Sequence, residues 1–142
     1  MPAPADVQTA NGGATAGRAE TGDTVTLTFG GTVNPDLVLA GWDGSATSVN
    51  VRLANAGGGD ILTVEDSGGS TLWALGGVDL QGHYTNGVVF TGSTMTLSTN
   101  TVTIVLGARG SGTMFTVVTP GTMAWLAPTG FASESGLLDV EF

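Results

Sequence analysis

The sequence contains no cysteine and no lysine, and only three of its 142 residues are basic. Without cysteine, the chain can form neither disulfides nor thiolate metal sites. Proteins bind nucleic acid mainly through Lys and Arg on phosphates, so a net charge of −9 argues against that class of partner and against anionic membranes. No apolar run approaches the roughly 18 residues of a membrane-spanning helix. We therefore expect neither a nucleic-acid partner nor a membrane partner.

Side chains suited to catalysis are also scarce. His83 is the only imidazole, so a Ser-His-Asp triad would have to use it, and no G-x-S-x-G motif supports one. Twelve scattered acidic residues do not define a pair of glycosidase carboxylates. We interpret His83 as a loop residue beside Tyr84. The sequence predicts a non-enzymatic protein that uses no cofactor.

Four aspartates occupy glycine-rich turns, where β proteins often bind hard cations. They are Asp43, Asp60, Asp66 and Asp79. None has the D-x-[DN]-x-[DN]-G spacing of a calcium loop. Aspartate commonly caps turns by accepting backbone N–H bonds, and this is the favoured interpretation, with Ca²⁺ as an open alternative.

Short alternating segments dominate the rest of the chain. In residues 24–29 (TVTLTF), apolar residues alternate with threonine, which is typical of a half-buried antiparallel strand. No window shows a helical period. Strands are predicted over 24–29, 37–40, 49–53, 61–64, 72–75, 88–90, 95–97, 102–106, 114–118, 122–126 and 139–142, with 133–138 as a loop. This spacing predicts one all-β domain over 23–142, an antiparallel β-sandwich of Ig-like or jelly-roll type.

Residues 1–22 contain Pro, Ala, Gly, Thr and Asn without periodicity. We interpret them as an extended N-terminal arm outside the sandwich; a floppy terminus is the plain alternative, and a partner subunit is one candidate for what holds the arm in place. Added to a neighbour's sheet edge, such an arm would gain affinity through main-chain hydrogen bonds.

Low charge combined with 41% hydrophobic residues predicts large interfaces, hence an oligomer or a subunit docked on an assembly. Trp73 and Trp125 lie in apolar runs, which favours core or interface positions. Trp42 follows a strand end, and with Tyr84 it could form a stacking platform for sugars. The candidate partner-binding residues are Trp42, Trp73, Tyr84, Met114 and Trp125.

Several strand patterns resemble known proteins. Residues 22–29 (GDTVTLTF), followed by 33–35 (VNP), resemble the opening strands of bacterial and phage immunoglobulin-like domains. Residues 41–44, 90–95, 102–107 and 121–125 are similar to segments of small structural proteins of tailed phages of actinobacteria. The resemblance covers roughly residues 22–126. It departs from the Ig-like pattern at 128–132 (PTGFA), where those domains often carry a D-x-A-G-N turn.

This resemblance implies a non-enzymatic virion protein that decorates and stabilises the capsid surface. Its partners would then be the major capsid protein and copies of itself. Two alternatives remain open: a carbohydrate-binding or adhesion module that uses Trp42 and Tyr84, and a subunit of a tail tube or fibre.

Overall fold

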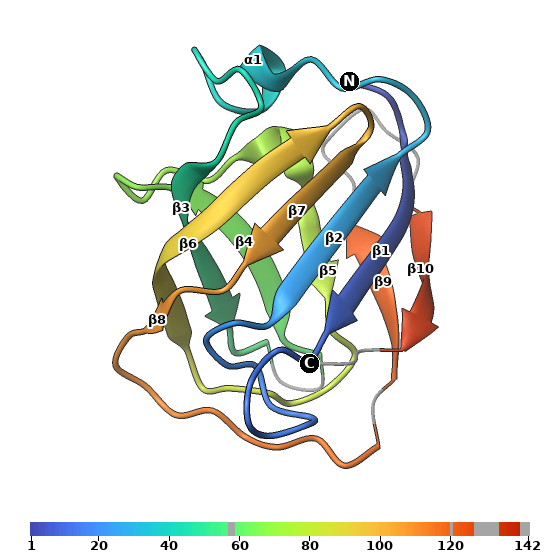
Figure 1. Cartoon of the computed structure of the whole chain (residues 1–142). Coiled ribbons are helices and arrows are strands. Elements are labelled where there is room, and N and C mark those ends of the chain that lie inside the picture. Colours follow the sequence, from blue (N-terminus) through green and yellow to red (C-terminus); the bar gives the residue numbers. More distant parts are fainter. Residues whose placement is uncertain (57–58, 120, 127–133, 140–142) are drawn as a thin grey trace.

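The computed structural model describes residues 1–56, 59–119 and 121–126, together with the backbone of 134–139 (Figure 1). Ten strands and two short helical turns follow one another along these residues. They are β1 (Pro4–Ala10), β2 (Thr24–Phe29), α1 (Pro35–Val38), β3 (Thr47–Ala54), β4 (Ile61–Asp66), η1 (Trp73–Leu75, a 3-10 turn), β5 (Gly77–Asp79), β6 (Val88–Ser98), β7 (Thr101–Val105), β8 (Ala108–Arg109), β9 (Thr122–Leu126) and β10 (Glu134–Asp139).

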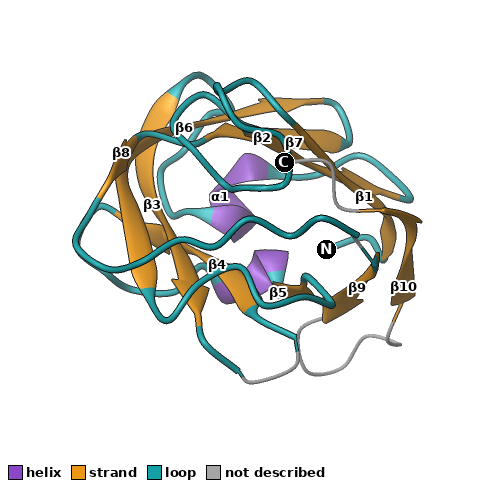
Figure 2. Ribbon diagram, turned by 90° about the horizontal axis from the view of Figure 1, so that it is seen from below, coloured by secondary structure: helices purple, strands orange, loops and turns teal. Residues whose placement is uncertain are grey.

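All ten strands belong to one antiparallel sheet with the order β1-β2-β7-β6-β3-β4-β5-β9-β10, and β8 pairs with β6. The sheet curls until it is nearly barrel-shaped, and β1 comes to lie beside β10 (Figures 1 and 2). The expected all-β antiparallel fold is confirmed. The expected sandwich is not, because the described strands form one continuous curled sheet.

Strand directions follow from this order. Eight antiparallel steps separate β1 from β10, so the two strands run in the same direction where the sheet meets itself (Figure 1). The two strands are thus parallel neighbours at the seam, whereas the paired strands within the sheet are antiparallel.

Period-2 alternation builds the core. In β2, Val25, Leu27 and Phe29 point inward and are buried, while the threonines between them remain partly exposed. Phe29 packs edge-on against Trp125 of β9, with ring centroids 5.0 Å apart. The alternation predicted from sequence is confirmed here.

The outer wall accounts for much of the threonine content. Thr26 of β2 is paired with Thr103 of β7, which is paired in turn with Thr96 of β6. Thr28, Thr101 and Ser98 form the next row in the same way. β-branched side chains suit a pleated, half-buried surface, so threonine covers this wall without charge.

The N-terminal segment corrects one prediction. Pro4–Ala10 is not an arm outside the domain but strand β1, paired antiparallel along β2, with Val7 and Thr9 buried. A bulge between Pro4 and Asp6 breaks strict alternation, and Val7 is the only strongly β-forming apolar residue in the segment. The pattern alone therefore did not reveal a strand that depends on the edge of β2.

Other segments also differ from expectation. Residues 37–40 and 72–75 were expected as strands, but helical turns α1 and η1 occupy these regions. Residues 88–90 and 95–97 belong to one strand, β6. Of 114–118, only Met114 makes an isolated bridge, to Thr85, because the chain there crosses the mouth of the barrel. Residues 134–138, expected as loop, form β10 with Asp139, and residues 140–142 lie outside the described residues.

The barrel has two unlike ends. The helical end comprises α1, η1 and the turns at 43–46 and 66–70, and lies at the top of Figure 1. The loop end comprises the segments 11–23, 80–87 and 106–117, which face the viewer in Figure 2. Among the described residues, no helix is long and apolar enough to cross a bilayer.

Candidate functional site

At the helical end, the η1 turn presents a tryptophan to solvent. Residues three apart share a face of a 3-10 helix, and Leu72 and Leu75 are both buried. Trp73 lies between them and is 74% exposed. The Trp125 indole N–H donates to the Leu75 carbonyl oxygen at 2.8 Å. Gly76, with φ of 66°, ends the turn. The exposed ring is thus carried on a turn anchored to the core.

The α1 turn beside it exposes a leucine in a similar way. The Asn34 side chain accepts the Asp36 N–H at 3.1 Å, and Pro35 occupies the first helical position. Val38 is buried, whereas Leu37 is 55% exposed. The two turns contact each other, so Leu37 and Trp73 lie on neighbouring elements at one end of the barrel. We call these two side chains the Trp73 patch.

The other predicted partner-binding residues are inside the molecule. Tyr84 and Trp125 are at most 1% exposed, and Trp42 and Met114 are at most 7% exposed. The Trp42 indole N–H is also used internally, because it donates to the Ser45 carbonyl oxygen at 2.6 Å. These four residues therefore belong to the core, and only Trp73 is available to a partner.

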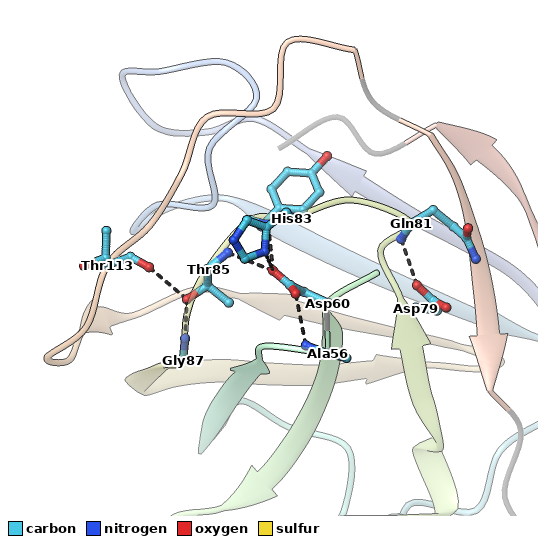
Figure 3. Close-up of polar contacts among 9 residues, drawn as sticks. Ala56, Asp60, Asp79, Gln81, His83, Thr85, Gly87 and Thr113 are labelled. Atoms are coloured by element: carbon cyan, nitrogen blue, oxygen red, sulfur yellow. Dashed lines mark hydrogen bonds and ion pairs between the residues drawn. The ribbon is translucent and has the colours of Figure 1, made fainter. Parts of the chain in front are cut away.

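At the loop end, Asp60 organises a buried polar cluster (Figure 3). Its carboxylate is fully buried and accepts backbone N–H groups from Tyr84 at 2.7 Å, Thr85 at 2.8 Å and Ala56 at 3.2 Å. His83 Nδ1 lies 3.5 Å from Asp60 Oδ2. These contacts hold the 80–87 segment against the start of β4.

Asp60 and His83 are two of the three residue types of a hydrolase triad, and their side chains approach to 3.5 Å. The third is missing from this site, because no hydroxyl is hydrogen-bonded to His83 within the described residues. The imidazole instead stacks on Phe115, with ring centroids 4.8 Å apart. The arrangement fits the interpretation of His83 as a loop residue beside Tyr84.

The remaining turn aspartates accept local N–H groups. Asp43 accepts from Ser45, Asp66 from Gly68 and Ser70, and Asp79 from Gln81, each at 2.9 Å. The Asp43 pKa lies below its usual value because the Ser45 hydroxyl and N–H stabilise the carboxylate. Across the described ranges, no group of three or more His, Asp or Glu side chains is placed to hold a metal ion.

A second buried carboxylate, Asp23, fastens the 11–23 segment. It accepts N–H groups from Gly12 at 2.8 Å, Gly13 at 2.9 Å and Glu20 at 2.8 Å. Burial nevertheless raises the pKa of Asp23 above its ordinary value, because desolvation of the charge outweighs these hydrogen bonds. Burial likewise raises the pKa of Tyr84 to about 12.

The 11–23 segment also forms a hollow of about 470 Å³ with β8. We call it the loop-end hollow; its wall includes Gly13, Ala14, Arg18, Ala19, Glu20 and Arg109. Two of the three arginines of the chain thus line one depression, whereas Arg52 pairs elsewhere with Glu65 at 2.8 Å. The sequence analysis did not predict this hollow. The one feature that could have indicated it is the scarcity of cations, because the chain has only three arginines and no lysine.

No protein-family model, curated protein or solved structure matches the chain. Function must therefore be argued from the chain's own residues, chiefly the Trp73 patch and the loop-end hollow.

Proposed function

We propose that this protein is a non-enzymatic structural subunit of a virion, and that it decorates and stabilises the capsid surface in many copies. The observation that carries a binding role is the exposure of Trp73. The other two tryptophans of the chain are buried, yet this one is 74% exposed on an anchored turn. Tryptophan is enriched at protein interfaces, where burying it removes a large apolar surface from water.

The polar residues support a structural role. The buried carboxylates of Asp23 and Asp60 each accept three backbone N–H groups, which is the contact pattern of a group that holds loops in place. A phage shell is the proposed partner because strand patterns within residues 22–126 resemble those of phage structural proteins. On this proposal, the curled sheet is a relative of the Ig-like or jelly-roll sandwiches.

The test is the copy number of this chain in purified particles of its source, measured by quantitative mass spectrometry against the major capsid protein. Decoration predicts a simple stoichiometric ratio to the shell protein. A handful of copies would instead indicate the tail, fibre or vertex role, and complete absence would overturn the virion proposal.

A glycan-binding role remains the second candidate, now on a different residue. Trp42 and Tyr84 are buried, so the platform first considered does not exist on the surface. The exposed ring of Trp73 is the stacking surface proposed instead. A glycan array probed with the wild-type protein and with Trp73→Ala tests this role. Binding to a defined glycan that Trp73→Ala loses would favour it over decoration.

A further inference from the structure

We propose that copies of this chain associate head to tail, with Trp73 of one copy entering the loop-end hollow of the next. The inference deepens the proposed function, because it names a second copy as the partner of the exposed ring on which that function rests. It draws on both ends of the barrel, which differ in shape, in charge and in chemistry.

The helical end is apolar at its tip and acidic around it. Trp73 and Leu37 are exposed on the two contacting turns. Asp36, Asp43 and Asp66 lie in α1 and the adjoining turns, and none of the three arginines belongs to this end. A partner surface must therefore accept a large ring and carry positive charge nearby.

The loop-end hollow has these properties. Small residues (Gly13, Ala14 and Ala19) line it and leave room for a side chain, and Arg18 and Arg109 supply two positive charges. Arg18 Nε donates to Thr116 Oγ1 at 3.1 Å, which orients the guanidinium. Arg109 extends from β8, is exposed, and has no ion pair within the described part of the chain.

One acidic residue, Glu20, also lines the hollow. Its carboxylate accepts the Thr15 N–H at 2.5 Å and so is already engaged within the 11–23 segment. Asp23, which accepts the N–H groups of Gly13 and Glu20, adds a second, buried carboxylate next to the hollow. The two arginines nevertheless place two guanidinium groups at one depression of a protein of net charge −9. A second copy brings the matching negative charge in Asp36 and Asp66.

Trp and Arg are suited to each other. An indole is the best aromatic partner for a guanidinium, and the attraction strengthens when both leave water. Arg and Trp are also the residues that most often dominate binding energy at interfaces.

The position of the two sites sets the symmetry. β2 and β4 lead into the turns of the helical end, whereas the 11–23 segment enters β2 from the opposite end (Figure 1). One copy can therefore use both sites at once, with different neighbours. Such a heterologous contact builds rings or filaments rather than closed symmetric pairs.

The experiment measures association of the purified protein alone, by sedimentation velocity over a concentration series at low and high salt. Wild type should form species that grow with concentration and weaken as salt rises. Trp73→Ala removes the ring, and the double variant Arg18→Glu/Arg109→Glu reverses the charge of the hollow. Each should weaken association by at least about tenfold. Val105→Ala and Thr26→Glu, on the barrel wall, are matched controls that should associate like wild type.

Mixing the two altered proteins gives the decisive result. Trp73→Ala retains an intact hollow, and the arginine variant retains an intact ring. An equimolar mixture should therefore form dimers and nothing larger. Circular dichroism confirms that each variant is folded. A wild type that stays monomeric overturns the proposal, as does one variant that associates alone as well as wild type.

Failure here and failure of the proposed function are distinguishable. A chain found in stoichiometric ratio to the shell protein, yet monomeric in solution, would decorate a capsid without head-to-tail contacts. If the chain associates head to tail but is absent from particles, the head-to-tail proposal stands and the virion proposal is overturned.

Discussion

The two ends of the barrel are closed in different ways. The loop end is crossed by long segments whose backbone N–H groups converge on the buried carboxylates of Asp23 and Asp60. The helical end is closed by two short turns, in which Val38 of α1 and Leu75 of η1 pack inward, and the Trp125 indole donates to the Leu75 carbonyl oxygen. Long irregular loops need many backbone partners, and a carboxylate can satisfy several at once. Short turns satisfy their own hydrogen bonds and can leave a large ring exposed.

The largest expected effect is at the inner side of the helical end. Trp125→Ala removes a buried ring that packs on Phe29 and bonds to Leu75. We expect the free energy of unfolding to fall by about 3–5 kcal/mol. Urea denaturation monitored by circular dichroism measures this. A loss below about 1 kcal/mol would show that the helical end does not depend on this anchor.

The corresponding change at the loop end is Asp60→Ala. It leaves three N–H groups without their acceptor, two of them fully inside the protein. We expect a loss of about 2–4 kcal/mol in the free energy of unfolding, somewhat less than for Trp125 if water enters. Asp79→Ala is the control, since within the described residues Asp79 accepts the Gln81 N–H alone, and its loss should cost under about 1 kcal/mol. Equal losses for the two variants would contradict the role of Asp60 in holding the 80–87 segment against the start of β4.

Tyr84 provides a pH test of the loop end. Its pKa is raised to about 12 in the folded protein by burial, against an ordinary value of 10.0. Between these values the unfolded chain has lost the proton that the folded chain retains, so stability should fall as pH rises above about 10. Tyr84 is the only tyrosine, so ultraviolet absorbance reports its ionisation directly. A midpoint near 10 in the folded protein would mean that the side chain is open to water.

Asp23 predicts a smaller dependence at acid pH. Because burial raises its pKa in the folded state, the folded protein binds the proton more tightly than the unfolded chain does. This group therefore contributes a stability that falls as pH rises from 3.8, its ordinary pKa, through the folded value. Comparing the pH dependence of unfolding with that of Asp23→Asn isolates the contribution. A variant with the same slope as wild type would contradict it.

The smallest effect on stability is expected on the outer side of the helical end. Trp73→Ala should change the free energy of unfolding of the monomer by no more than about 0.5 kcal/mol, because the ring is already in water. The variant should lose most of the acrylamide-quenchable tryptophan fluorescence, since the other two indoles are buried. If the variant is quenched as strongly as wild type, the Trp73 ring is already covered, and the helical end does not leave a large ring exposed.

Much of the fold was predictable from local patterns. Alternation in 24–29, 49–53 and 102–106 identified β2, β3 and β7, because a half-buried strand needs an apolar residue at every second position. Short apolar runs were ambiguous. The apolar pattern of residues 72–75 fits a buried strand and a 3-10 turn equally well. The packing of Leu72 and Leu75 in the folded protein decides between these two structures.

The candidate site was less predictable. The five residues selected as large rings or from apolar segments of the sequence included the one exposed tryptophan, but not Leu37, Arg18 or Arg109. Exposure depends on which neighbours cover a ring, and Arg18 and Arg109 are ninety-one residues apart (109 − 18). No local pattern indicates that β8 and the 11–23 segment enclose one hollow.

The sequence by itself thus determined the class of the fold, the absence of thiol chemistry and the acidic character of the chain, because each depends on composition or on neighbouring residues. The tertiary structure alone decided that residues 4–10 complete the sheet, that four of five candidate residues are buried, and that the ring and the arginines lie at opposite ends. These outcomes depend on contacts between segments that lie far apart in the sequence and meet only in the folded chain.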